Sequence, residues 1–202
     1  ILAVEWGPVT VLQWSGNAFH DVTPRFAHAQ IRGWWQSVEV TDINGDGLPD
    51  ILAGNLGLNN PFGENLPLKL FHTDLDRNGK QDAILAWYAP SENGKRRFFP
   101  FALRDELTAQ IPSIKAIYPT YAAFSSVAVP DLLQLTEERV TEKTINSLES
   151  VLLINRDGND FTVHPLPKPA QWGPGHAFLA DDFNRDGRPD LLCAGNAQDL
   201  PV

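Results

Sequence analysis

The chain has 202 residues, 43% hydrophobic and 10% aromatic, so it is long and apolar enough to build a core and is not expected to be disordered. Its formal net charge of -9 argues against binding to the phosphate backbone of nucleic acids. No run of 18 apolar residues occurs, so we predict neither a membrane-spanning helix nor membrane insertion.

Two features of composition give further expectations. The chain begins with Ile1 and contains no Met, which predicts a piece of a longer protein, so the missing signal peptide says nothing about the compartment. Cys193 is the single cysteine and cannot form an internal disulfide. We expect a buried thiol there, because free cysteines are among the most buried residues.

The first half of the chain is typical of β-strands. Residues 1–6, 9–14 and 18–22 are rich in β-formers and are separated by Gly-containing turns, so residues 1–23 are predicted as outer strands of one sheet. Within residues 33–90 we predict four antiparallel strands in a single sheet. They are expected at residues 35–41, 51–54, 68–73 and 83–88.

The period changes in residues 101–149, where apolar residues recur every three or four positions. The stripe consists of Leu103, Leu107, Ile111, Ile114 and Ile117, and three prolines break the region, so it predicts several short helices. Strands return in residues 150–202, at 150–155, 161–165, 177–181 and 191–194. Residues 1–202 are therefore predicted to be all-β with a helical insertion.

Three nine-residue loops carry nine of the 25 acidic residues. They span residues 42–50, 74–82 and 182–190, and we number their positions one to nine. Positions one, three, five and nine are Asp or Asn, and position six is always Gly. The candidate side-chain ligands are Asp42, Asn44, Asp46 and Asp50 in the first loop, Asp74, Asp76, Asn78 and Asp82 in the second, and Asp182, Asn184, Asp186 and Asp190 in the third.

The spacing of these residues suits calcium. Calcium takes six to eight oxygen ligands, and short Asp and Asn side chains on alternate residues of a tight turn can point to one centre. Glycine at position six supplies the positive φ of a sharp turn. The backbone carbonyl at position seven (Leu48, Lys80 or Arg188) adds another oxygen. We therefore predict three calcium sites. Magnesium is the weaker alternative, because it usually retains waters and avoids all-protein cages. The other alternative is ordinary Asp-Gly and Asn-Gly hairpin turns without metal, which three matches at all five fixed positions argue against.

Other metal motifs do not fit. An EF-hand needs Glu at position twelve and flanking helices, whereas position twelve is Ala53, Leu85 and Cys193 and the flanking segments are β-rich. The pattern also recurs at a distance of 140 residues, because residues 33–50 match residues 173–190 at both Gly and loop positions. A repeated hairpin of this kind indicates an array or a propeller.

The loops and the strands that follow them, Ile51-Leu52-Ala53-Gly54 and Leu191-Leu192-Cys193-Ala194-Gly195, resemble FG-GAP/VCBS repeats, which form the blades of integrin alpha-subunit propellers. The phrase from Gly33-Trp34-Trp35 to Asn55-Leu56-Gly57-Leu58-Asn59 resembles the bacterial VCBS-type proteins. The resemblance implies a β-propeller. The predicted strands suffice for about three blades, whereas a propeller needs about four to eight, so we expect a partial ring completed by sequence absent from this chain, and the alternative is that the blades stack without closing. Residues 1–23 would be outer strands of one blade, residues 33–90 a full blade, residues 101–149 an insertion and residues 150–202 further blade strands.

We expect an extracellular, cell-surface or periplasmic module that binds a protein or carbohydrate ligand or acts as a scaffold. No residue is assigned a catalytic role, because neither a nucleophile elbow nor a phosphate-binding loop occurs. The rival hypothesis is part of a calcium-dependent, polysaccharide-acting enzyme whose active site lies largely outside this chain. A concave cleft with two free carboxylates near exposed Trp would favour the enzyme, and a flat face with buried Trp would favour the binding module.

Overall fold

The computed structural model describes residues 1–63, 65–158 and 160–195. The chain folds as two compact units. The first, here called the host unit, consists of Ile1–Gly63 and Ile145–Val202. The second, the insert unit, is the continuous stretch Glu64–Thr144 between the two stretches of the host unit.

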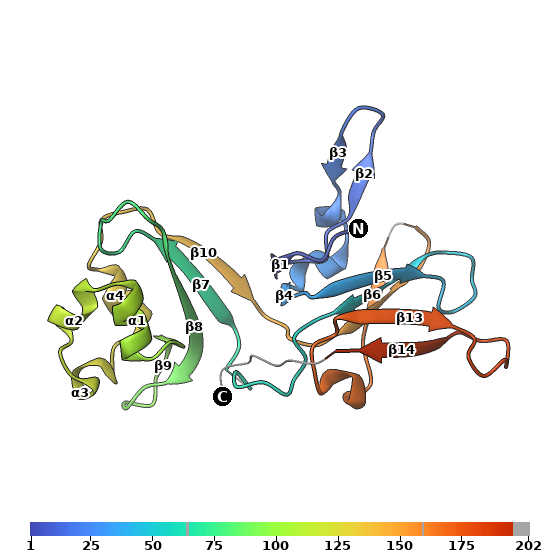
Figure 1. Cartoon of the computed structure of the whole chain (residues 1–202). Coiled ribbons are helices and arrows are strands. Elements are labelled where there is room, and N and C mark those ends of the chain that lie inside the picture. The colour runs from blue at the N-terminus through green and yellow to red at the C-terminus, as the bar shows by residue number, and fades with distance from the viewer. Residues whose placement is uncertain (64, 159, 196–202) are drawn as a thin grey trace. The chain divides into compact units, whose positions relative to one another are not determined.

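The main sheet of the host unit has four antiparallel strands in the order β12-β11-β6-β5, of which Figure 1 labels β5 and β6. They are β5 (Ser37–Thr41), β6 (Asp50–Gly54), β11 (Val151–Asn155) and β12 (Phe161–Pro165). All five residues of β6 are buried, because this central strand has a hydrogen-bonded neighbour on each side. Its pairing with β11, with Leu52 opposite Leu152, joins segments about a hundred residues apart in sequence.

Shorter hairpins and bridges complete the described part of the host unit. β1 (Glu5–Gly7) pairs with β4 (Gly33–Trp34), β2 (Leu12–Trp14) with β3 (Phe19–Asp21), and β13 (Ala177–Asp181) with β14 (Asp190–Ala194). Short 3-10 helices span Thr23–Arg25, Ala27–Gln30 and Lys168–Gln171. β13 contacts both β5 and β6. The hairpin that bears the third loop therefore packs beside the strands that bear the first.

The core of the host unit lies against the main sheet. Val9 and Trp35 pack on Ile51, Ala53, Val151 and Leu153, which come from β6 and β11. The indole N–H of Trp35 donates to the Gly7 carbonyl oxygen at 2.9 Å, so this large ring is buried without an unsatisfied donor.

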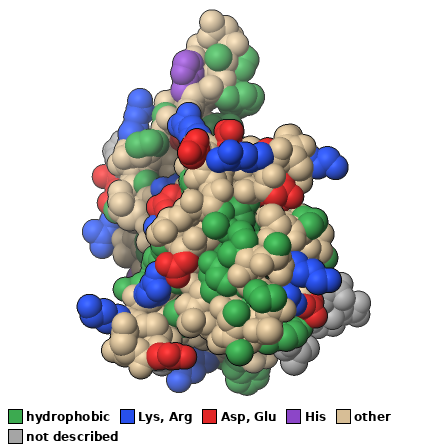
Figure 2. Space-filling model, turned by 90° about the vertical axis from the view of Figure 1, so that its left-hand side faces the viewer, with side chains coloured by type: hydrophobic (Ala, Val, Ile, Leu, Met, Phe, Trp, Pro, Cys, Tyr) green, Lys and Arg blue, Asp and Glu red, His purple; other side chains and the backbone are tan. Residues whose placement is uncertain are grey.

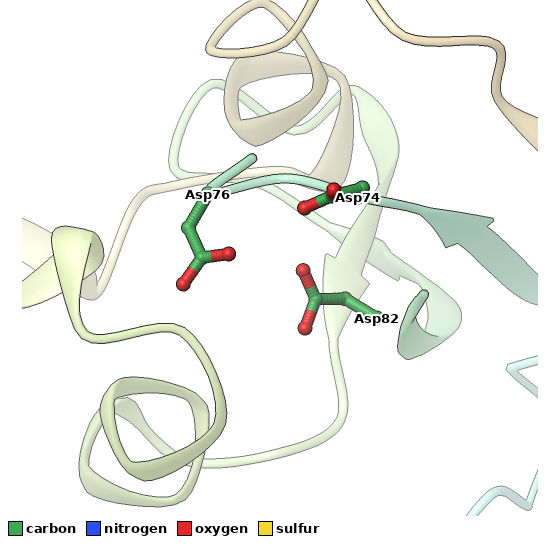
Figure 3. A group of neighbouring side chains, drawn as sticks. All are labelled: Asp74, Asp76 and Asp82. Carbon is green, nitrogen blue, oxygen red and sulfur yellow. The ribbon is translucent and has the colours of Figure 1, made fainter. Parts of the chain in front are cut away.

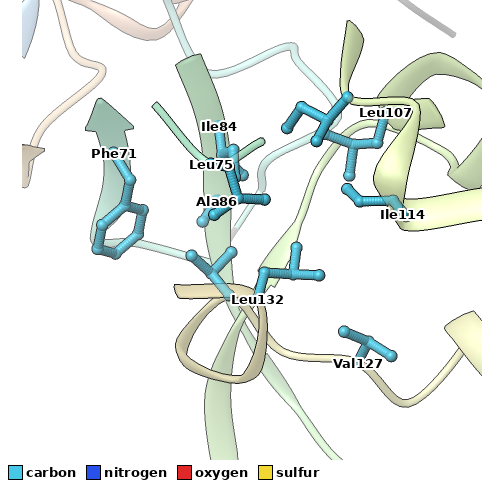
Figure 4. Packing of buried hydrophobic residues seen from close by; sticks show 10 residues of the cluster. Phe71, Leu75, Ile84, Ala86, Leu107, Ile114, Val127 and Leu132 are labelled. Atoms are coloured by element: carbon cyan, nitrogen blue, oxygen red, sulfur yellow. The ribbon is translucent and has the colours of Figure 1, made fainter. Parts of the chain in front are cut away.

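The insert unit packs four short helices on a four-stranded sheet of order β10-β7-β8-β9. The strands are β7 (Leu68–Thr73), β8 (Asp82–Pro90), β9 (Arg96–Pro100) and β10 (Thr141–Ile145), and the helices are α1 (Arg104–Gln110), α2 (Ser113–Ile117), α3 (Tyr121–Phe124) and α4 (Val129–Leu133). Figure 4 shows the core between these layers. The sheet and the loop between β7 and β8 contribute Phe71, Leu75, Ile84 and Ala86. The helical side contributes Leu107, Ile111, Ile114, Val127, Val129 and Leu132.

Local chemistry explains where the helices begin and how they are tied down. Glu106, in the first turn of α1, accepts a hydrogen bond from the Leu103 N–H at 2.8 Å. Its negative charge also interacts favourably with the helix dipole at this N-terminal end. Asp131 does the same for the Ala128 N–H of α4 at 2.9 Å. It also pairs with Arg97 of β9 at 2.7 Å, so α4 is linked to the edge of the sheet.

The expectation of a mainly β chain with few helices is confirmed. The pairing of the strands differs from the prediction, because the four strands of residues 33–90 are divided between two sheets. β5 and β6 pair with β11 and β12, whereas β7 and β8 pair with β9 and β10. A reason lies in the connection from β6 to β7, which contains Pro61 and Pro67 and is too long for a tight hairpin.

Two local expectations are also corrected. The region 101–149 contains the helices but ends in a strand, β10, and only the middle of the predicted stripe is buried, with Leu103 and Ile117 exposed. Cys193 is exposed rather than buried, because β14 is hydrogen-bonded only to β13 among the described strands. In the described part of the chain, no helix is long and apolar enough to cross a bilayer.

His28 is buried in an apolar setting, with 1% of its surface exposed. Its ring stacks on Phe26 and meets the edge of Phe161. Nε2 lies 3.1 Å from the Val9 carbonyl oxygen, which only accepts, so Nε2 carries the proton and the partnerless Nδ1 carries none. Burial lowers the pKa of His28, while the Val9 carbonyl and the charge of Asp160 act in the opposite direction.

This histidine predicts an acid-sensitive host unit. In the unfolded chain the ring takes up a proton near pH 6.5, whereas the folded state keeps it neutral to a lower pH. Unfolding is therefore accompanied by proton uptake below pH 6.5. As the pH falls below this value, His28 lowers the free energy of unfolding by at most about 1.4 kcal/mol for each pH unit. Urea melts of the wild type and of His28→Gln between pH 7.5 and 5.5 should show a flatter pH dependence for the variant. The exposed His164→Gln serves as the control, and equal slopes for all three proteins would contradict the assignment.

Candidate metal sites

Each acidic loop joins two paired strands, as the sequence predicted. The first connects β5 to β6, the second β7 to β8, and the third β13 to β14. The register is the same in all three hairpins, because the residue before position one lies opposite position nine. The pairs are Thr41 with Asp50, Thr73 with Asp82, and Asp181 with Asp190.

The carboxylate at position one organises the turn. In the first loop Asp42 accepts hydrogen bonds from the N–H groups of Asp46 and Gly47, at 3.1 and 2.8 Å. Asp74 accepts from the same two positions at 3.0 and 2.7 Å, and Asp182 at 3.0 and 2.9 Å. The three loops thus share one internal hydrogen-bond pattern, which a chance Asp-Gly turn does not require.

The carboxylate at position nine closes the loop from the far side. Asp50 and Asp82 each accept the N–H of position two at 3.0 Å, and Asp190 accepts that of position three at 3.2 Å. Asp50 is fully buried, Asp82 is only 4% exposed, and none of the ion pairs among the described residues involves a loop carboxylate. A buried carboxylate without a positive partner is costly, so these positions favour a bound cation.

The backbone shows a second left-handed position that the sequence did not reveal. Position six has φ between 81° and 87° in the three loops, as its glycine predicted. Position four is also left-handed, with φ of 76° at Gly45, 61° at Arg77 and 63° at Arg185. Gly45 at position four of the first loop indicates a positive φ, but the arginines at this position in the other two loops do not.

The second loop brings three carboxylates together. Figure 3 shows Asp74, Asp76 and Asp82 turned toward a common centre. One carboxylate oxygen of each lies within 4.8 Å of those of the others, and no other group of acidic, His or Cys side chains among the described residues meets this criterion.

The first and third loops differ from the second in the order of Asn and Asp at positions three and five. The side-chain amide of Asn44 donates to Asp46 at 2.8 Å, and that of Asn184 donates to Asp186 at 3.2 Å. An amide donor therefore partly balances the carboxylates in these two loops. The second loop has Asp76 at position three and Asn78 at position five, and none of its hydrogen bonds joins the Asn78 amide group to a carboxylate as donor. Its one side-chain amide donor comes from outside the loop, because Gln110 donates to Asp82 at 3.5 Å.

The predicted backbone ligands at position seven occupy equivalent places. The N–H groups of Leu48, Lys80 and Arg188 donate to the side-chain oxygen at position five, at 2.8, 2.9 and 2.9 Å. These bonds fix the peptide group between positions six and seven. That the carbonyl oxygens of the three residues bind metal stays a prediction.

The donor set fits a hard cation. Every candidate ligand is a carboxylate, amide or carbonyl oxygen, which suits calcium or magnesium rather than zinc or copper. The second loop would hold the ion through Asp74, Asp76 and Asp82. A cation there would neutralise three converging negative charges and so stabilise the hairpin.

Comparison with known families agrees with the repeat pattern. A family model described as an FG-GAP-like repeat matches residues 1–53, a range that contains the first loop and ends within β6. Residues 1–53 are therefore similar to an FG-GAP-like repeat. No curated protein and no solved structure matches the chain.

Replacing Gly79 by Ala tests the left-handed position alone. A Cβ at Gly79 meets no atom within 4 Å, so the substitution adds no clash and its cost comes from the φ of 83°. We expect a loss of about 1–2 kcal/mol in the free energy of unfolding of the insert unit, measured by urea denaturation in a chelator. Lys80→Ala, at the next exposed position, is the control and should change the stability by less than about 0.5 kcal/mol. Equal effects of the two substitutions would show that position six does not require glycine.

Proposed function

We propose that this chain is a calcium-stabilised FG-GAP-type module that serves as an extracellular or cell-envelope ligand-binding or scaffold unit. The observation that supports the proposal most is the common hydrogen-bond pattern of the three loops, with the same strand register and oxygen-only donors. Asp and Asn at four positions of each loop are the ligands we assign to calcium.

Calcium is preferred over magnesium on chemical grounds. Magnesium requires near-ideal octahedral geometry and usually keeps several waters, whereas calcium accepts irregular cages of side-chain and backbone oxygens. The loops offer up to five protein oxygens each when the position-seven carbonyl is included. Such a site is structural, because it binds its hairpin together and exposes no reactive group.

Calcium concentration then favours a place outside the cytoplasm. Extracellular modules bind calcium with constants of about 0.1–1 mM, which suits exposed loops such as these. At ~1 mM calcium and a dissociation constant of ~0.1 mM, each site would add about 1.4 kcal/mol to the free energy of unfolding. Three sites together would supply a substantial part of the stability of an ordinary domain.

A β-propeller is the architecture we propose for the host unit. Propeller blades are four-stranded antiparallel sheets, and β12-β11-β6-β5 is a sheet of this kind with the first loop at one of its hairpins. The match of residues 1–53 to an FG-GAP-like repeat supports the same assignment. In this role the loops brace the blade hairpins, and the partner is a protein or a carbohydrate.

Thermal melting tests the metal assignment. Melts in about 1 mM calcium, in about 1 mM magnesium and in a chelator should show a calcium-specific rise in melting temperature, because each occupied site adds about 1.4 kcal/mol. For a chain of this size that corresponds to about 3–6 °C per site. Asp76→Asn should reduce the rise, because it removes one of the three carboxylates that converge in the second loop.

The matched control is Glu138→Gln, which removes an acidic side chain that is exposed and lies outside the loops. It should leave the calcium-dependent rise unchanged. Equal melting temperatures in calcium and in chelator would mean that the loops are plain hairpin turns, and the metal proposal would fail.

A further inference from the structure

A cavity of about 440 Å³ lies in the insert unit, beside the ends of β8 and β9 and next to α3. Its lining is mainly apolar and aromatic, including Trp87 and Phe99 from the strands and Tyr121 and Phe124 from α3. Figure 2 shows hydrophobic side chains gathered near the middle of the face that it draws. The volume is within the range of about 300–1,000 Å³ that is typical of small-ligand sites.

Tyr121 is exposed and yet held in one position. It has 57% of its surface exposed. Its hydroxyl donates to Asp105 at 2.6 Å, and the guanidinium of Arg104 lies 5.7 Å from its ring centroid. A large aromatic ring that is exposed but already ordered offers a binding surface with little further loss of conformational entropy.

The strand side of the cavity is also rigid. Trp87 meets Phe101 edge-on, with ring centroids 5.5 Å apart and planes at 87°. Both residues line the same cavity as Tyr121. A ligand in this cavity therefore meets fixed aromatic rings from both the sheet and α3.

The electrostatics of the cavity favour an uncharged ligand. Arg104 is the one charged residue in the lining described. Each of its three guanidinium nitrogens already hydrogen-bonds, to the Tyr118 carbonyl, the Pro119 carbonyl and Asp105, at 2.8–2.9 Å. The charge of Arg104 is thus matched by Asp105, and an ionic ligand would be desolvated without gaining a free counter-charge.

A second, more polar cavity of about 390 Å³ continues from the first. The two share Pro90, Phe99 and Ser125 in their linings. Ser91, Asn93 and Ser126 add hydroxyl and amide groups to the second cavity, and its Arg97 is paired with Asp131 at 2.7 Å. The combined groove thus changes from aromatic to hydrogen-bonding without acquiring a strong net charge.

We propose that this groove, named here the insert groove, binds a neutral oligosaccharide. A pyranose ring presents an apolar C–H face that stacks on aromatic rings, and its hydroxyls suit the serine and asparagine groups of the second cavity. This inference rests on the proposed function only in assigning a ligand-binding role, and it names the ligand class and the place. Glu92 is the one carboxylate in the described lining of the two cavities, whereas glycoside hydrolysis commonly uses a pair, so we assign binding rather than cleavage.

The test is calorimetric titration of the full chain in calcium with hexasaccharides of glucose, xylose, mannose and galactose, and with anionic oligogalacturonate. We expect at least one neutral sugar to bind and oligogalacturonate not to bind at physiological ionic strength. Tyr121→Ala should weaken the binding about fivefold or more, because a stacked ring contributes about 1 kcal/mol. Tyr121→Phe should retain most of the affinity, because it keeps the ring.

Trp172→Ala is the matched control, because it removes an aromatic ring that is 69% exposed but lies in the host unit. It should leave sugar binding unchanged. The proposal is overturned if no neutral sugar binds or if Tyr121→Ala binds as well as the wild type.

Calcium-dependent melting of the same samples separates this proposal from that of the loops. If the insert groove is assigned wrongly and the loops correctly, calcium raises the melting temperature but no sugar binds. If the loops are assigned wrongly, the calcium-specific rise disappears, and sugar binding that depends on Tyr121 still stands.

Discussion

The arrangement of this molecule depends on a carboxylate placed at the first residue of a strand and held by the backbone of the preceding turn. Asp50 shows the constraint most completely. It is buried, it accepts the N–H of Ile43 across the loop, and it also accepts the N–H of Asn155 at 2.7 Å. One side chain thus fixes the turn, the register of β5 with β6, and the junction with β11. Because a buried charge is costly, the same residue supports our proposal that the loop binds a cation.

The sequence predicts most strands but not their pairing, for a physical reason. Period-two patterns and turn residues are local, so β5, β6, β7 and β8 are found near their predicted positions. Pairing of β6 with β11 joins two apolar segments that the whole insert unit separates in sequence, and no local pattern predicts which distant segments pair. The burial of the helical stripe is predicted only in part for a similar reason. The 3.6-residue period continues through Leu103 and Ile117, but the helices there are too short to bury them.

The candidate metal loops are more predictable than the groove, since all their ligands lie within nine residues. Even so, the left-handed position four escapes notice where Arg77 occupies it, because arginine carries no conformational signal. The exchange of Asp and Asn between positions three and five is visible in the sequence. Its effect, that three carboxylates converge only in the second loop, follows from the three-dimensional structure. The insert groove could not be predicted, because Trp87 and Tyr121 are distant in sequence and lie on different elements.

The insert unit leaves and re-enters the host unit through β7 and β10, which are neighbours in one sheet. A segment anchored in this way can be lengthened, shortened or exchanged while the strands that it interrupts keep their partners. Groove residues such as Trp87 and Tyr121 belong to that segment, whereas the first and third loops belong to the host unit. Under our proposal for the insert groove, ligand recognition and the architecture of the host unit can therefore evolve at different rates, and an engineer could transfer the insert unit to another host sheet.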